Sequence, residues 1–370
     1  MMWMILFLLM PLLGIAYIGW HVWTLVPLPV VWRIGLIALS IASFMLVFLN
    51  FRHTIDDLPL PLARLVYDWG NSSLFVLLYL VIAFLLLDLG RLLHILRPEW
   101  LRQNFIITAC VACTLFVVFV LGNIHYHNKV RHELHLTTDK PLAQPLKLVM
   151  LSDMHLGYHN PRKELARWVD MINRERPDLV LIAGDIIDMS MRPLLEENMA
   201  EELRRIKAPV YACLGNHEYY SSEPRAEAFF SDAHIHLLRD TCAVVGDLCI
   251  IGRDDRTNRN RKTMEQLTAT LHTTPYAQHT TQKKYTILLD HQPYHLEEAE
   301  QAGIDFQLSG HTHYGQVWPV SWITDALYEC AFGEHQRAKT RYYVSSGMGI
   351  WGAKFRIGTR SEYVVAYIDN

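Results

Sequence analysis

The sequence has no excess of positive charge. Its 370 residues include 34 Lys and Arg against 37 Asp and Glu, which gives a formal net charge of −3. A protein that holds DNA or RNA mainly through phosphate contacts needs a strongly basic surface. The composition therefore argues against a dedicated nucleic-acid binder, and no nucleic-acid partner is expected.

Cysteine is also scarce. The chain has six cysteines, and their spacing is not that of a thiolate metal site. Cys242 and Cys249 flank a predicted tight turn, in which Cys242 would pair with Ile251 and Cys249 with Val244. A disulfide between these two cysteines would need another strand register. We expect packing roles for the cysteines, and they leave the redox compartment open.

Charged residues are rare in the first third of the chain, where apolar residues are concentrated. The first run lacks the basic n-region and the small-residue cleavage site of a secretory signal peptide, so we predict that it is retained. Each apolar run is close to the length that crosses the hydrocarbon core of a membrane. We predict about four transmembrane helices, with three as the alternative, at residues 1–20, 34–51, 74–87 and 105–122.

Basic residues flank these runs on both sides of the membrane. Arg91, Arg97 and Arg102 favour one orientation, whereas Arg64 and Lys129 are among those that favour the other. The sequence therefore predicts a multi-pass protein of the cell membrane without fixing its sidedness. The expected organisation is a membrane domain at 1–123, a juxtamembrane linker at 124–145 and a further domain at 146–370.

The chain after residue 146 alternates short apolar runs with amphipathic helical segments. That order predicts a layered α/β domain. Part of the preceding linker, 130–136, alternates enough to form an edge strand. The other strands are predicted at 146–151, 179–183, 210–214, 285–289 and 306–308, and the helices at 164–174, 193–206 and 295–302.

Each of the five strands predicted from residue 146 onward ends in a polar cluster. Ligands of layered α/β domains bind at the carboxyl ends of the strands, so the clusters are expected to converge. They read Ser-Asp-Met-His at 152–155, Gly-Asp-Ile-Ile-Asp at 184–188, Gly-Asn-His-Glu at 215–218, Asp-His-Gln-Pro at 290–293 and Gly-His-Thr-His at 310–313.

The residue types in these clusters are typical of a metal site. Carboxylate, imidazole and amide oxygen together suit divalent Mn, Fe or Zn better than calcium. Side chains two residues apart in an extended segment point the same way, so Asp153 with His155, and His311 with His313, can face one pocket. Asp and Asn commonly cap turns, and a single His is commonly a surface residue. These ordinary roles do not explain all five clusters together.

In this order the clusters resemble the motifs D-x-H, G-D-x-x-D, G-N-H-[ED], a lone His and G-H-x-H of the calcineurin-like metallophosphoesterase superfamily. The resemblance covers residues from about 146 to the C-terminus and implies that an α/β metallophosphoesterase domain, a layered β-sandwich flanked by helices, follows the predicted N-terminal transmembrane helices. It implies one divalent ion held by Asp153, His155 and His313, a second held by Asn216, His291 and His311, and Asp185 as the bridge.

The same resemblance implies hydrolysis of a phosphate ester or pyrophosphate bond. Two ions clamp the phosphoryl oxygens and activate a water as hydroxide for in-line attack. His217 would protonate the leaving oxygen, for which an imidazole has a suitable pKa. Asp188 and Glu218 would orient ligands or tie loops together.

Longer phrases narrow the resemblance to the bacterial membrane-associated YkuE-like group. Met189 and Ser190 replace the Arg-Gly of serine/threonine protein phosphatases, and Asp188 stands where purple acid phosphatases have Tyr. Tyr314 departs from the Gly that is common in the YkuE-like group. Some members hydrolyse UDP-2,3-diacylglucosamine, which implies a lipid-linked phosphoester substrate and contact with membrane lipids. No feature indicates an oligomeric state.

Other interpretations remain. The chain could be a membrane sensor or scaffold with a catalytically silent metal domain, although the intact motifs and His217 argue against it. A transporter is disfavoured, because Asp88 is the only ionisable residue near the interior of the predicted spans. The polar insert at 252–284 is either a flap over the site or a solvated loop, and Asp290 is either a turn or a site residue. We expect surface or linker positions for His125, His127, His132, His159, His234, His236, His295 and His335.

Overall fold

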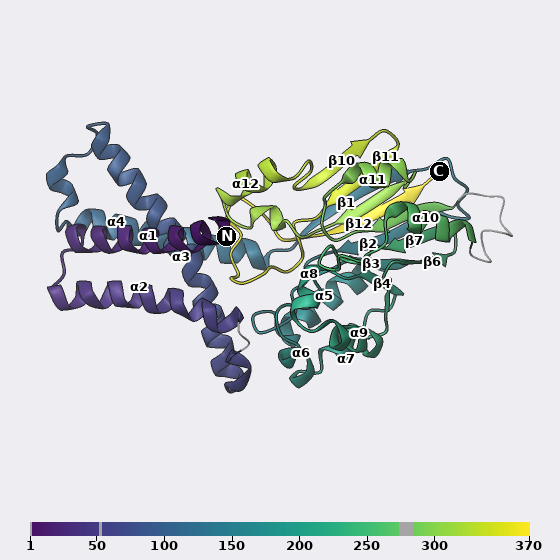
Figure 1. Ribbon diagram of the computed structural model, residues 1–370, viewed down its shortest axis with the longest axis horizontal. Helices are drawn as coiled ribbons and strands as arrows, with labels where there is room; N and C mark the ends of the chain where they lie inside the picture. The colour runs from purple at the N-terminus through teal and green to yellow at the C-terminus, as the bar shows by residue number, and fades with distance from the viewer. Residues whose placement is uncertain (1, 52–53, 274–283) are drawn as a thin grey trace. The chain divides into compact units, whose positions relative to one another are not determined.

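The computed structural model describes residues 2–51, 54–273 and 284–370 (Figure 1). The chain divides into two compact units. Met1–Asn123 and Gly352–Lys354 form the first, which we call the helical unit. Ile124–Trp351 and Phe355–Asn370 form the second, which we call the sandwich unit.

The helical unit consists of long apolar helices. They are α1 (Met2–Leu25), α2 (Val30–Phe51), α3 (Leu60–Leu92) and most of α4 (Phe105–His127), with the short helices η1 (Thr54–Asp57) and η2 (Pro98–Leu101) between them. Within the described part of the chain, Val30–Leu49, α3 and α4 are long and apolar enough to cross a membrane. The side chains of residues 1–9 lie outside the described residues, so the span at 1–20 stays a prediction.

Helix α3 is much longer than the segment predicted at 74–87. It has 33 residues and begins at Leu60, because its polar positions are satisfied inside the unit. Asn71 donates to the carbonyl of Tyr67, and the Ser73 hydroxyl donates to the carbonyl of Gly70. Near its other end, Asp88 accepts a hydrogen bond from the Tyr17 hydroxyl at 2.6 Å.

The sandwich unit contains two six-stranded sheets. The first has the strand order β1-β12-β2-β3-β4-β5 and the second β10-β11-β9-β8-β7-β6. The first sheet contains β1 (Val130–Thr137), β2 (Leu146–Leu151), β3 (Leu179–Ala183), β4 (Val210–Cys213), β5 (Ile235–Leu237) and β12 (Glu362–Asp369). The second contains β6 (Thr241–Val245), β7 (Leu248–Gly252), β8 (Tyr285–Leu289), β9 (Phe306–Ser309), β10 (Gly333–Arg337) and β11 (Thr340–Val344).

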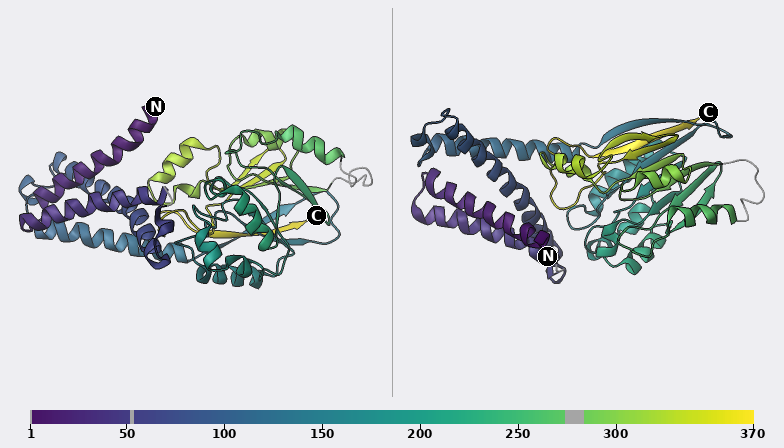
Figure 2. Two further views of the ribbon diagram at one scale, coloured as in Figure 1. Left: turned by 60° about the horizontal axis from the view of Figure 1, so that its bottom comes forward. Right: turned by 45° about the horizontal axis from the view of Figure 1, so that its top comes forward.

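Three apolar clusters define four layers. Side chains such as Met150, Leu181 and Ile287 fill the space between the sheets. A second cluster packs helices on the outer face of the first sheet, and a third packs helices on the outer face of the second. The first group includes α5 (Arg162–Glu175), α6 (Arg192–Glu196), α7 (Met199–Leu203) and α9 (Glu223–Asp232), and the second includes α10 (Met264–Thr273) and α11 (Leu296–Gln301), as Figures 1 and 2 show.

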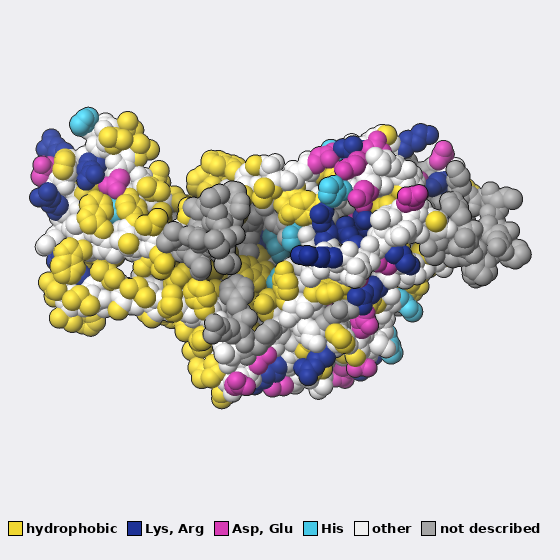
Figure 3. Space-filling model, in the orientation of Figure 1, with side chains coloured by type: hydrophobic (Ala, Val, Ile, Leu, Met, Phe, Trp, Pro, Cys, Tyr) yellow, Lys and Arg dark blue, Asp and Glu magenta, His cyan; other side chains and the backbone are white. Residues whose placement is uncertain are grey.

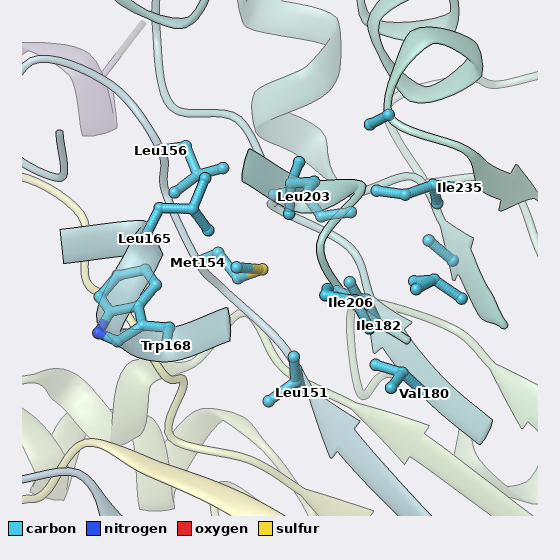
Figure 4. Close-up of a cluster of buried hydrophobic side chains, with 14 of the residues drawn as sticks. Leu151, Met154, Leu156, Leu165, Trp168, Val180, Ile182, Leu203, Ile206 and Ile235 are labelled. Carbon is cyan, nitrogen blue, oxygen red and sulfur yellow. The ribbon is translucent and has the colours of Figure 1, made fainter. Parts of the chain in front are cut away.

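Helix α5 illustrates why these layers form. Its buried side chains Leu165, Trp168, Val169 and Ile172 recur every three or four residues and make one apolar stripe. Figure 4 shows Leu165 and Trp168 in the cluster with Leu151 and Met154 from the first sheet and the loop after it. The helix ends at Arg176, whose left-handed backbone (φ 51°) reverses the chain.

The predicted strands are confirmed, with boundaries that agree to within one residue. The predicted edge strand at 130–136 is β1, which lies at an edge of the first sheet. The hairpin of β6 and β7 has the expected register, with Cys242 opposite Ile251 and Val244 opposite Cys249. The prediction of one helix at 193–206 is wrong, because Asn198 adopts a left-handed conformation (φ 52°) and separates α6 from α7.

One half-buried carboxylate, that of Glu175, ties α5 to the first sheet. The Arg131 Nε donates to Glu175 at 2.8 Å, the Lys147 Nζ donates at 2.9 Å and the Tyr363 hydroxyl donates at 3.1 Å. Burial raises the pKa of the Glu175 carboxyl, but these hydrogen bonds outweigh burial and hold the pKa below its ordinary value. The ionised form therefore stabilises the fold.

Replacing Glu175 by Gln is expected to lower the free energy of unfolding by about 2 kcal/mol at neutral pH. Because the folded pKa is depressed, the contribution is present above the ordinary carboxyl pKa of about 4.3 and disappears as pH falls through the folded value. Urea unfolding of the full chain at several pH values measures this difference. Glu265→Gln, at an exposed position of α10, is the control, and an effect of Glu175→Gln that does not change with pH would contradict the assignment.

Candidate metal centre

The five polar clusters lie at the carboxyl ends of five strands. β2, β3 and β4 are parallel neighbours in the first sheet, and β8 and β9 are parallel neighbours in the second. Parallel strands end at the same edge of a sheet, so the loops that follow them come together. The structure brings together all seven residues that the sequence predicts as metal ligands, and a ring nitrogen of His217 also lies within 4.8 Å of ligand atoms of His155 and Asp185.

The first group contains Asp153, His155 and His313. Their ligand atoms all lie within 4.8 Å of one another. The Nε2 atoms of the two imidazoles are 3.1 Å apart, and the Nε2 of His313 lies 3.5 Å from an Asp153 oxygen. Asp153 and His155 are buried, whereas His313 is half-buried.

The second group contains Asp185, His291 and His311, whose ligand atoms also lie within 4.8 Å of one another. The Nε2 of His291 is 3.1 Å from Asp185 Oδ2. The amide oxygen of Asn216, the first residue of α8 (Asn216–Tyr220), lies 2.9 Å from the Nδ1 of His311. Carboxylate, imidazole and amide donors therefore face one point in this group.

Within the second group, Asp185 is the residue that also faces the first group. Its Oδ2 is 3.1 Å from the Nε2 of His291 and 3.7 Å from the Nε2 of His155. Its Oδ1 accepts a hydrogen bond from the backbone N–H of His217 at 2.9 Å, which fixes the carboxylate plane. One carboxylate oxygen is thus directed at both groups.

The hydrogen bonding of His291 fits a bound cation. Its Nδ1 bonds the carbonyl of Ala183 at 2.7 Å and must therefore carry a hydrogen. Its Nε2 is buried and has no hydrogen-bond partner, although it faces an Asp185 oxygen. Two lone pairs that face each other need a proton or a metal ion between them. The donor set suits a divalent transition metal.

The pKa values of the imidazoles and of Asp185 also reflect how closely these groups lie. Burial favours the neutral form of His291, but Asp185 outweighs it and raises the pKa of this imidazole well above its ordinary value. Burial likewise raises the pKa of Asp185, and His291 and His217 outweigh it and lower that pKa. Burial and the nearby His291 lower the pKa of His311 to about 4. Without metal, protons occupy part of the site, so a metal ion has to displace them.

The backbone around the site is unusual. Five of the seven predicted ligands have left-handed conformations: φ is 52° for Asp153, 45° for His155, 52° for Asp185, 71° for His311 and 48° for His313. Each such conformation costs about 1–3 kcal/mol in a residue other than glycine. Strain concentrated in this way is typical of functional sites, because the surrounding fold holds the ligands in position.

Two glycines allow the carboxylates to approach the loops closely. A Cβ atom at Gly310 would lie 2.2 Å from an oxygen of Asp153, and a Cβ atom at Gly215 would lie 2.2 Å from an oxygen of Asp185. Both distances are far below van der Waals contact. Gly215 of the third motif thus provides room for Asp185 of the second, and Gly310 of the fifth provides room for Asp153 of the first.

Comparisons with known proteins agree with this geometry. The family model of the calcineurin-like phosphoesterases matches residues 146–315. An uncharacterised metallophosphoesterase of Aquifex aeolicus is 30% identical over 264 residues, which cover 69% of this chain and 98% of that protein. The chain belongs to the calcineurin-like metallophosphoesterase family. The residues matched by the family model, 146–315, include all five motifs.

Other relatives of this metallophosphoesterase are longer than the shared region. An uncharacterised metallophosphoesterase of Helicobacter pylori is 30% identical over 232 residues, and the match spans 61% of this chain but only 60% of that protein. A zebrafish protein named "transmembrane protein with metallophosphoesterase domain" is 29% identical over 365 residues, which cover 90% of this chain and 79% of that protein.

Two acidic side chains support the ligand loops of the metallophosphoesterase. Asp188 Oδ1 lies 3.3 Å from the Nδ1 of His155 and 3.3 Å from the Nδ1 of His217. The buried Glu218 carboxylate accepts hydrogen bonds from the backbone N–H groups of Asp185, Ile187 and Gly215. It therefore joins the loops after β3 and β4, which is the kind of position that the sequence predicts for it.

His217 lies at the edge of the site. Its ring packs edge-on against His155, with the ring centroids 4.5 Å apart. It is more exposed than the buried imidazoles of His155 and His291, with 11% of its side-chain surface accessible.

The predicted position of His159 is wrong. It was expected at the surface or in a linker, but it is buried, and its Nε2 bonds the carbonyl of Ile350. Its Nδ1 lies 3.9 Å from Asp188, which also contacts His155. Its place only four residues after His155 was the available signal.

The insert after β7 is not simply a solvated loop. Arg253, Asp254 and Asp255 are buried, so the solvated-loop prediction is wrong for its first part. The buried Asp290 forms ion pairs with Arg253 at 3.3 Å and with Arg261 at 3.1 Å. Asp290 thus anchors this segment beside the site. Residues 274–283 of the insert lie outside the described residues.

Proposed function

We propose that this metallophosphoesterase hydrolyses a phosphate ester or pyrophosphate bond with two divalent metal ions. Asp153, His155 and His313 would hold one ion, and Asn216, His291 and His311 the other. The observation that carries the proposal is Asp185 Oδ2, which lies 3.1 Å from His291 and 3.7 Å from His155 and would bridge the ions. When bound, the ions neutralise phosphoryl charge and make a water acidic enough to attack phosphorus near neutral pH.

The residues of the chain have separate tasks in this proposal. His217 protonates the oxygen of the leaving group, which its partial exposure and its contact with His155 support. Asp188 orients the rings of His155 and His217, because one of its oxygens lies 3.3 Å from the Nδ1 of each. Glu218 keeps Asp185 in place through the backbone.

The types of ligand atom also limit which metal ions suit the site. The proposed ligands are carboxylate, imidazole and amide oxygen, and no cysteine belongs to either group of the described residues. This set favours Mn, Fe or Zn, since calcium prefers a site made of oxygen ligands alone and soft metals prefer thiolates.

A membrane-associated, lipid-linked substrate is the finer part of the proposal. The helical unit has apolar helices of membrane-spanning length, and the zebrafish relative carries the word transmembrane in its name. Helix α12 (Val320–Leu327) directly follows the loop of His313 and exposes Trp322 (64%), Ile323 (58%) and Leu327 (65%). Exposed aromatic and aliphatic side chains of this kind suit a membrane interface. We propose a multi-pass membrane protein that acts at the lipid surface.

A panel of phosphoesters tests this function. The full chain in detergent is supplied separately with Mn, Fe, Zn and Mg and is offered monoesters, diesters and pyrophosphates. Each class is offered with and without acyl chains, and UDP-2,3-diacylglucosamine is one of the acylated pyrophosphates. We expect turnover with Mn, Fe or Zn, loss of turnover on chelation, and higher kcat/KM for an acylated substrate than for its soluble counterpart.

The outcomes separate the two parts of the proposal. Equal kcat/KM for acylated and soluble substrates would reject the lipid-linked substrate and leave the phosphoesterase in place. Bound metal without turnover on any phosphoester would instead support the scaffold interpretation.

A further inference from the structure

Three of the four arginines in the segment after β7 have buried or half-buried side chains, and their partners differ. Arg253 pairs with Asp290 and Glu298, and Arg261 also pairs with Asp290. Among the described residues, Arg256 has neither a carboxylate partner nor a hydrogen-bond acceptor. Figure 3 shows that Lys and Arg side chains gather beside His side chains on this face of the sandwich unit. Of these three arginines, Arg256 is therefore the one whose charge is not neutralised by a carboxylate of the described residues.

Arg256 is nevertheless held in place. Its guanidinium carbon lies 4.5 Å from the centre of the Tyr294 ring, in a cation–π contact. Its Nη1 atom is buried and donates no hydrogen bond. A buried charged donor without an acceptor destabilises the protein. This atom is therefore positioned to gain an acceptor from outside the chain.

The Tyr294 ring, which Arg256 contacts, is connected to the metal centre through Tyr328. The Tyr294 hydroxyl donates to the Tyr328 hydroxyl at 2.9 Å, and the two rings are 4.7 Å apart. The Tyr328 ring in turn lies 6.4 Å from the ring of His311, a proposed ligand of the second ion. A continuous series of ring contacts thus connects Arg256 with His311.

The residue before Arg256, Asp255, is hydrogen-bonded to a residue of the site. The carboxylate of Asp255 accepts hydrogen bonds from the Gln292 amide at 2.9 and 3.1 Å. Gln292 directly follows His291, the other imidazole proposed for the second ion. The hydrogen bonds of Asp255 with Gln292 and the contact of Arg256 with Tyr294 therefore hold Arg256 close to the proposed ligands of the second ion.

We propose that Arg256 binds a second phosphoryl group of the substrate, next to the one that is attacked. This inference rests on the proposed function, and it selects pyrophosphate-type substrates over esters with a single phosphoryl group. The planar guanidinium matches phosphate oxygens, and the buried Nη1 would donate to one of them. Arg256 contacts Tyr294 and belongs to neither group of proposed ligands, so it would contact a part of the substrate that the ions do not hold.

Binding of two phosphonates that cannot be hydrolysed at their P–C bonds tests the proposal. Titration calorimetry on the full chain in detergent, with free Mn in excess, compares methylenediphosphonate with methylphosphonate. In Arg256→Gln we expect about 10- to 100-fold weaker binding of methylenediphosphonate and a change below about threefold for methylphosphonate. Arg256→Lys, which keeps the charge but loses the planar fork, is expected to lie between Arg256→Gln and the parent.

Arg259→Gln is the matched control, because Arg259 is an exposed arginine of the same segment. It should bind both phosphonates as the parent protein does. Equal weakening of both ligands in Arg256→Gln, or no weakening of either, would overturn the proposal. The readout does not require turnover, so a protein that hydrolyses no phosphoester yet shows the selective loss would refute the proposed function and retain the anion site.

Discussion

Asp185→Asn is expected to lower kcat by about 1,000-fold or more. The amide keeps the shape of the side chain and one oxygen for the His217 N–H. It loses the negative charge that lies between His291 and His155. Bound metal is expected to fall below two ions per chain. Activity assays and elemental analysis on the same preparation measure both quantities.

Asp170→Asn is the matched control for this substitution. Asp170 is an exposed carboxylate of α5 that forms an ion pair with Arg205. The control should retain full activity and full metal content. Parent-level activity in Asp185→Asn would refute the bridging role, and with it the two-metal mechanism.

His217→Gln is expected to show an effect that depends on the leaving group. An imidazole that protonates the leaving oxygen contributes about 100- to 10,000-fold to the rate when that oxygen is a strong base. Alkyl phosphoesters should therefore lose activity on this scale in the variant. p-Nitrophenyl phosphoesters should lose much less, because nitrophenolate leaves without a proton. Steady-state kinetics on the two substrate types measure the difference.

His236→Gln provides the control, since His236 is exposed on β5 and stacks on Tyr211 away from the metal ligands. It should leave both rates unchanged. Equal losses on alkyl and nitrophenyl substrates in His217→Gln would show that His217 positions the ligand His155 or the substrate and does not act as the proton donor.

The convergence of the five motifs could be predicted from sequence because it follows from strand topology. Asp153, Asp185 and His291 each follow a short apolar run, and such runs form parallel strands whose ends meet. The order of the motifs then specifies the family, which the matched model and the Aquifex relative show. The ligand roles of these residues stay predictions until a metal is located.

Other features could not be predicted because they depend on distant partners. Asp290 neutralises Arg253 and Arg261, so a segment that is polar in sequence packs beside the site. The break between α6 and α7 depends on the conformation of Asn198, and periodicity alone does not detect such a break. His159 is buried because its ring reaches the carbonyl of Ile350, which lies 191 residues away in the chain.

The position of the metal ions tests the account most directly. Crystals of the protein grown with Mn and measured at the Mn absorption edge should give two anomalous peaks. One peak should lie among Asp153, His155 and His313, the other among Asn216, His291 and His311, and Asp185 should lie between them. A single peak, or two peaks away from these side chains, would contradict the proposed binuclear centre.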